Sequence, residues 1–148
     1  MSLLAFLAGL FGCTKAPAHE TSQLRAISIS CGAMNYSYCY SFFLYRQEDQ
    51  WLLEAECFTQ DHEVETKISG KAVESGEIDT LLDILERNGT IEYAETYKEP
   101  EKTYQVMDET VYSLSLTFED DARYSIGSIG TARPELEAFF YRLAEETK

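Results

Sequence analysis

Strict alternation of apolar and small polar residues between positions 112 and 118 most constrains the fold of this chain. The apolar positions are Tyr112, Leu114, Leu116 and Phe118, and serine or threonine fills the positions between them. Because successive side chains of a strand point to opposite faces, this period of two predicts a strand with one buried and one exposed face. Strands of this kind predict an antiparallel sheet with helices packed on one face only.

A hairpin with aromatic strands is expected earlier in the chain. Residues 38–45 and 51–59 are rich in aromatic and β-branched residues and flank the polar segment 46–50. This arrangement predicts two strands joined by a five-residue loop. With Tyr45 opposite Trp51, the odd-numbered side chains of the hairpin form its apolar, core-facing side.

That register has two consequences for candidate sites. It brings Cys39 opposite Cys57, where a disulfide is possible in an oxidising compartment; two buried thiols that act as small hydrophobic side chains are the alternative. It also turns the even-numbered residues outward, where aromatic rings stand among glutamates. The candidate binding face is therefore made of Tyr38, Tyr40, Phe42, Glu54 and Glu56.

Two amphipathic helices complete the pattern. One covers residues 75–88 and ends at Gly89, and the other begins at Pro134, the favoured first position of a helix. Their apolar stripes are Ile78, Leu81, Leu82 and Leu85 in the first and Leu136, Phe139, Phe140 and Leu143 in the second. With weaker strands at 26–33 and 64–69, and a partner strand at 123–129, the expected order is ββββαββα, an α+β fold.

The N-terminus carries the clearest indication of location. Residues 3–11 are apolar and uncharged, a length that suits the hydrophobic region of a secretory signal and is too short to span a bilayer. Leu10-Phe11-Gly12-Cys13 resembles the lipobox of bacterial lipoproteins, in which the cysteine is lipidated and becomes the mature N-terminus. The resemblance implies a signal-like segment at 1–12, a lipidation site and tether at 13–24, and a single α+β domain at 25–148.

Two other interpretations of this segment stay open. No basic residue precedes Lys15, although a signal usually begins with positive charge. The leucines at positions 3, 4, 7 and 10 fall at helical spacing. The segment is then an apolar helix docked on a cytoplasmic protein, or else an anchor that is not cleaved.

Composition excludes several classes of function. The net charge of −14 leaves no basic stripe to neutralise phosphates, which argues against nucleic-acid binding. It also argues against binding to anionic lipid, so membrane contact is expected through the lipid anchor only. No motif for a cofactor or a metal ion occurs, and none of either is expected. Catalysis would require Cys57, His62 and a carboxylate to meet in one cleft.

Taken whole, the chain resembles small lipoproteins of anaerobic bacteria that have no assigned biochemical role. The likeness covers the lipobox-like end, the hairpin with Trp51 and the closing helix, and it supplies no catalytic residues. The expected function is an exported, lipid-anchored, non-enzymatic domain that binds a protein, peptide or glycan at the cell surface. The alternative is an acidic inhibitor or immunity-like protein that binds a basic enzyme.

Overall fold

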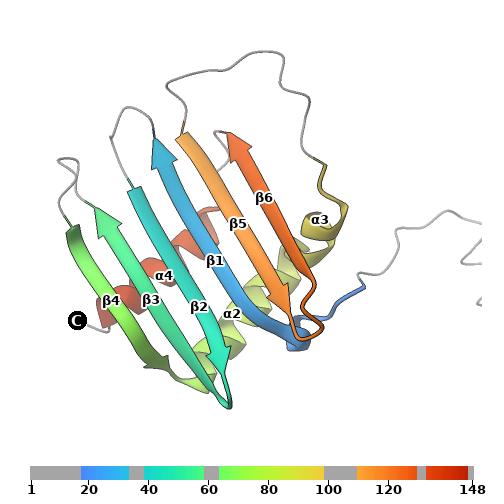
Figure 1. Ribbon diagram of the computed structural model, residues 1–148, viewed down its shortest axis with the longest axis horizontal. Helices are drawn as coiled ribbons and strands as arrows, with labels where there is room; N and C mark the ends of the chain where they lie inside the picture. Colours follow the sequence, from blue (N-terminus) through green and yellow to red (C-terminus); the bar gives the residue numbers. More distant parts are fainter. Residues whose placement is uncertain (1–17, 34–38, 59–63, 99–109, 130–132, 147–148) are drawn as a thin grey trace, which may run out of the picture.

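The fold is α+β, with one six-stranded antiparallel sheet and helices on one of its faces (Figure 1). The computed structural model describes residues 18–33, 39–58, 64–98, 110–129 and 133–146. The strands are β1 (Leu24–Ala33), β2 (Cys39–Gln47), β3 (Gln50–Phe58), β4 (Val64–Val73), β5 (Thr110–Phe118) and β6 (Arg123–Ile129). The helices are the 3-10 turn η1 (Thr21–Gln23), α2 (Ser75–Arg87), α3 (Thr90–Thr96) and α4 (Pro134–Glu146).

The strands are ordered β4-β3-β2-β1-β5-β6 across the sheet. Each of the first three strands pairs with the next along the chain, and β5 returns to pair with β1 rather than with β4. The chain can reach β1 because α2 and α3 carry it back across one face of the sheet (Figure 1). The predicted order of strands and helices is confirmed, with α3 added between the two expected helices.

The core lies between the sheet and its helices. In β5 the predicted alternation holds, since Leu114, Leu116 and Phe118 are almost fully buried and the intervening Ser115 and Thr117 are not. The predicted stripe of α4 is buried as well, and Ala144 joins it. In α2, Ile84 is buried together with the predicted residues and Leu82 is only partly buried. Gly89 ends α2 with a φ of +59°, a conformation that glycine adopts without a steric penalty.

The register of the hairpin differs from the prediction by one residue. Gln47 lies opposite Gln50, so the connection is a two-residue turn at 48–49 and the expected five-residue loop is wrong. The polar residues at 46, 47 and 50 belong to the strand ends, and Glu48 enables the tight turn by adopting a φ of +56°. Because side chains alternate, a shift of one residue exchanges the two faces of β2.

Candidate functional site

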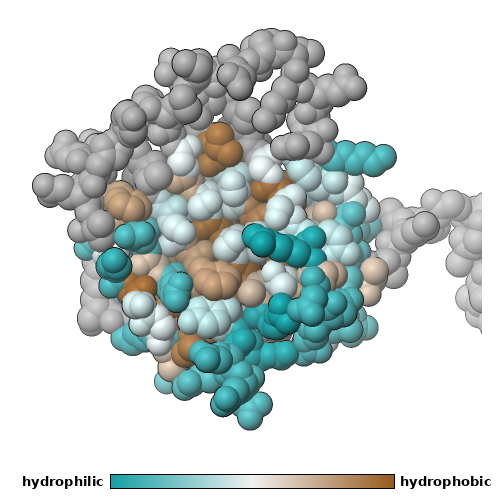
Figure 2. Space-filling model, viewed as in Figure 1, coloured by the Kyte–Doolittle hydropathy of each residue, from teal (hydrophilic) through white to brown (hydrophobic). Residues whose placement is uncertain are grey.

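The face of the sheet that the helices leave uncovered presents many small hydroxyl side chains. They occupy the positions that alternate with buried residues in the central strands. They are Ser28 and Ser30 of β1, Ser41 of β2, Ser113, Ser115 and Thr117 of β5, and Ser125 of β6. Figure 2 looks onto this open face: side chains of intermediate hydropathy cover its middle, and hydrophilic ones gather along its lower edge.

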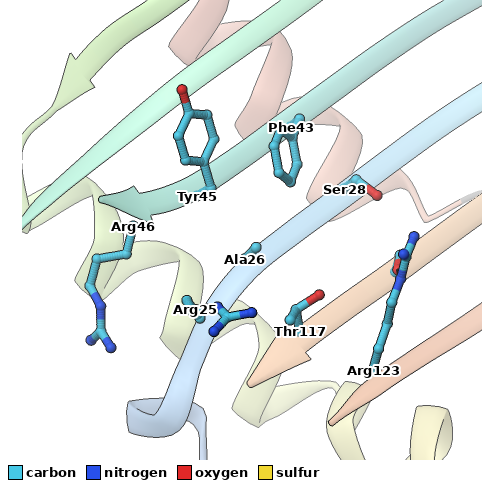
Figure 3. Close-up of a pocket in the computed structure, with 9 residues that line it drawn as sticks. Arg25, Ala26, Ser28, Phe43, Tyr45, Arg46, Thr117 and Arg123 are labelled. Atoms are coloured by element: carbon cyan, nitrogen blue, oxygen red, sulfur yellow. The ribbon is translucent and has the colours of Figure 1, made fainter. Parts of the chain in front are cut away.

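A hollow of about 310 Å³ lies in the open face. Ala26 and Ser28 of β1 form its floor, the rings of Phe43 and Tyr45 stand on one side, and Arg123 of β6 stands on the other (Figure 3). The two rings are stacked, with centroids 4.8 Å apart. The hollow exists because β1 and β5 carry small side chains at positions where β2 and β6 carry large ones.

A β-bulge adds a charged group to the hollow. Leu24 pairs with Phe118 and Ala26 pairs with Thr117, so Arg25 is an extra residue in β1. Without the bulge, strict alternation from the buried Leu24 would send Ala26 to the core side of the sheet. With it, Arg25 and Ala26 both line the hollow on the open face.

Three of the six arginines of the chain line this hollow. Arg25 Nη1 lies 2.6 Å from Asp121 Oδ1, and Arg46 Nη2 lies 2.6 Å from Glu119 Oε1. The Nε of Arg123 donates to Ser115 Oγ at 3.1 Å. Within the described part of the chain, no carboxylate lines the hollow. In a protein of net charge −14, three guanidinium groups gather here, and two of them are paired with carboxylates that stand outside the lining of the hollow.

The opposite charge lies on the other side of Phe43. A second, shallower hollow of about 220 Å³ is lined by Phe43, Glu54, Glu56 and Lys67, among other residues of β2, β3 and β4. Glu56 stands opposite Lys67 in the β3–β4 pair, and the hydroxyl of Tyr45 donates to Glu54 at 3.4 Å. The rings of Phe43 and Tyr45 therefore separate two halves of the open face. We call the half that the arginines line the basic half, and its hollow the basic hollow. The half that Glu54 and Glu56 line is the acidic half.

The sequence located only part of this surface. Glu54 and Glu56 lie on the open face as predicted, and Tyr38 falls outside the described residues. Tyr40 and Phe42 are only 4% and 0% exposed, so their assignment to the binding face is wrong. Their place is taken by Phe43 and Tyr45, which a two-residue turn, the commonest hairpin connection, would have indicated.

The two misassigned aromatic residues belong to the core. Phe42 stacks on Phe140 of α4, with ring centroids 5.3 Å apart. Burial and a hydrogen bond to the Glu137 carboxylate raise the pKa of Tyr40 above its ordinary value. The side chain of Tyr40 therefore remains a neutral hydroxyl buried beneath the helices, where a ligand in solution does not reach it.

The predicted cysteine pair is also displaced by the register. Cys39 lies opposite Phe58, and Cys57 lies opposite Tyr40, so the directly opposed pair expected for a Cys39–Cys57 disulfide is wrong. Cys57 is buried on the helix side of the sheet. His62, the base that a catalytic cysteine would need, lies outside the described residues, as does Cys13.

A second group of polar side chains holds the first described residues of the chain against the folded domain. Glu95 of α3 accepts hydrogen bonds from the backbone N–H groups of Ala18, at 2.8 Å, and His19, at 3.0 Å. The imidazole lies between two carboxylates, with Nδ1 2.9 Å from Glu95 Oε1 and Nε2 2.7 Å from Asp120 Oδ2. It also stacks on Phe118, with ring centroids 4.4 Å apart. We call His19, Glu95 and Asp120 the histidine clamp.

The charges of the histidine clamp reinforce one another. Hydrogen bonds to Asp120 and Glu95 raise the pKa of His19 above its ordinary 6.5. The bond from His19 lowers the pKa of Asp120. Burial opposes ionisation of Glu95, but its hydrogen bonds from His19 and Ala18 outweigh this, and its pKa is lowered. The sequence placed His19 in the tether and gave no signal of partners 76 and 101 residues away.

Neither protein families, curated proteins nor solved structures match this chain. Within the described residues, no helix combines the length and apolar character needed to cross a membrane. No group of three His, Cys, Asp or Glu side chains in the same residues is placed to hold a metal ion. The residues that line the basic hollow carry positive charge, hydroxyl groups and aromatic surface, which are means of binding and positioning a ligand.

Proposed function

We propose that this protein is an exported, lipid-anchored, non-enzymatic domain that binds a ligand at the cell surface through the open face of its sheet. The observation that carries the proposal is the basic hollow. A β-bulge in β1 and the strands β2 and β6 gather three arginines around it, although acidic residues outnumber basic ones by 26 to 12 in the chain. Bulges commonly redirect side chains beside functional sites.

The proposed anchor is Cys13. The apolar segment before it and the short polar stretch after it support lipidation there and a tether to the domain. A lipid anchor leaves the whole folded domain outside the bilayer, so the open face is accessible to a ligand in the envelope. The net charge of −14 makes the lipid, rather than the protein surface, the source of membrane affinity.

Replacing Cys13 with alanine is expected to move the protein from the membrane fraction to the soluble fraction of its source cells. The wild-type protein should carry acyl mass and begin at Cys13, because lipidation and cleavage both require the thiol. Intact mass spectrometry of each fraction measures this, and Thr14→Ala is the matched control that keeps the anchor. A soluble wild-type chain that retains Met1 contradicts the anchor and leaves the apolar segment to be explained as a packed helix.

A second candidate function is supported by the acidic half of the open face. Glu54 and Glu56, together with the acidic surplus of the chain, could bind a basic enzyme as an inhibitor or immunity protein does. Such binding would weaken steeply with added salt and would be lost in Glu54→Gln. Binding that instead depends on the arginines of the basic hollow favours the first proposal.

A further inference from the structure

We propose that the basic hollow binds a carboxylate-bearing sugar of an acidic polysaccharide. This inference rests on the proposed function, since it names the ligand of the same open face. Three features of the hollow carry it: guanidinium groups, side-chain hydroxyl groups, and an aromatic wall (Figure 3).

The arginines supply donors for a carboxylate. Within the described residues, Arg123 makes no ion pair; its recorded bond, to Ser115, uses only Nε. A guanidinium has five N–H donors in a planar fork that matches the two oxygens of a carboxylate. Arg25 and Arg46 each contact one carboxylate of an exposed residue, and exposed pairs of this kind contribute little stability. Their remaining donors are available at small cost.

The floor suits the hydroxyl groups of a sugar. Ser28, Ser115 and Thr117 line the hollow, and a hydroxyl side chain can donate and accept at the same time. Sugar hydroxyls have the same double character, so each can bond to the floor in either direction. Phe43, which is 38% exposed, offers an apolar surface to the C–H groups of a sugar ring.

The shape of the hollow favours a saccharide over a peptide. Its volume of about 310 Å³ is at the lower end of the range for small-ligand sites, enough for a ring-sized group. A peptide that added to the sheet would use an edge strand, whereas this hollow lies over β1 and β5, at the end of the sheet where β1 and β6 begin. It also lacks the deep apolar pocket in which protein partners bury their anchoring side chains.

The test is calorimetric titration of the full-length protein with trigalacturonic acid and with its neutral methyl ester, both at low ionic strength. We expect the acid to bind and the ester to bind at least tenfold more weakly, because the ester cannot form the paired charged hydrogen bonds. Binding of the ester with equal affinity overturns the proposal. So does equal binding of poly-glutamate, which would show recognition of charge without sugar.

Two variants locate the site. Arg123→Gln removes the charge of the guanidinium that β6 contributes, and Ser28→Leu fills the hollow without changing charge; each is expected to weaken binding of the acid tenfold or more. Arg87→Gln, on the helix side of the molecule, is the matched control and should bind as the wild type does. Unaltered unfolding midpoints show that the variants fold. Unchanged affinity in Arg123→Gln and Ser28→Leu overturns the assignment.

Retention on washed envelope fragments separates this inference from the proposed function. We expect the Cys13→Ala protein, which carries no lipid, to be retained, and this retention to be lost when Ser28→Leu is added and to be competed by trigalacturonic acid. Retention that depends on Ser28 but resists the competitor overturns the sugar ligand and leaves the binding face. Retention independent of Ser28 overturns both. The free protein would instead self-associate if the acidic half of one copy contacted the basic half of another. Self-association that Arg123→Gln abolishes would overturn the sugar ligand and make a second copy the occupant.

Discussion

Replacing Phe42 with alanine is expected to lower the free energy of unfolding by about 3–5 kcal/mol, the usual cost of deleting a fully buried phenylalanine. Its ring is 0% exposed and contacts the rings of Phe140 and Tyr141 in α4 as well as that of Tyr40. The substitution therefore leaves a cavity between the sheet and its covering helix. Urea unfolding followed by circular dichroism measures the loss.

Phe43→Ala is the matched control for this prediction. The two phenylalanines are neighbours in β2, but Phe43 lies on the open face, is 38% exposed and stacks on Tyr45. Its loss is expected to cost less than about 1 kcal/mol, since much of the ring is already in water. A larger loss from Phe43→Ala than from Phe42→Ala would contradict the observed register and restore the one-residue alternative.

Stability is expected to fall as the pH rises above 6.5, the ordinary pKa of histidine, because the histidine clamp loses its proton. A folded-state pKa raised above 6.5 means that the native protein holds the proton of His19 more tightly than the unfolded chain does. The stabilisation is fully present below the unfolded value and disappears as the pH passes the raised folded value. The lowered pKa values of Glu95 and Asp120 act in the opposite direction, so stability also falls in acid.

His19→Phe tests whether the histidine clamp causes this pH dependence. Phenylalanine keeps an aromatic ring against Phe118 but cannot donate to either carboxylate. We expect a loss of about 2 kcal/mol at pH 5.5, typical of hydrogen bonds to charged groups, and a flatter curve up to pH 8.5. His62→Gln removes the other histidine of the chain and serves as the control. A flattened curve in His62→Gln, with an unchanged one in His19→Phe, would assign the effect elsewhere.

The sequence correctly predicted those strands and helices whose buried side follows from one regular repeat of apolar residues. The alternation in β5 and the stripe of α4 each follow from which side of one element meets the core, and both are confirmed. The seven-residue α3 was missed because two turns are too short to establish a helical period. It matters nonetheless, since it carries Glu95 of the histidine clamp.

The basic hollow was beyond prediction for a different reason. Its position depends on the register of β1 against β2 and β5, and on the bulge at Arg25, which pair residues far apart in the sequence. Alternation with a period of two identifies the exposed side chains of each strand. It does not say which exposed side chains of different strands lie next to one another. For the hairpin, treating polar strand ends as loop displaced the register by one residue and exchanged Phe42 with Phe43.

For a lipid-anchored protein, the histidine clamp limits the length of the tether between the lipid and the domain. With Ala18 and His19 held by Glu95, only five Cα–Cα steps, from Cys13 to Ala18, separate the lipid from the domain, a distance of at most about 18 Å. Release of Ala18 and His19, with η1 still held by the hydrogen bond from Glu119 N–H to the Gln23 carbonyl, would lengthen the span from Cys13 to Thr21 to at most about 29 Å. The protonation of one imidazole would then set how deep into the envelope the open face can reach.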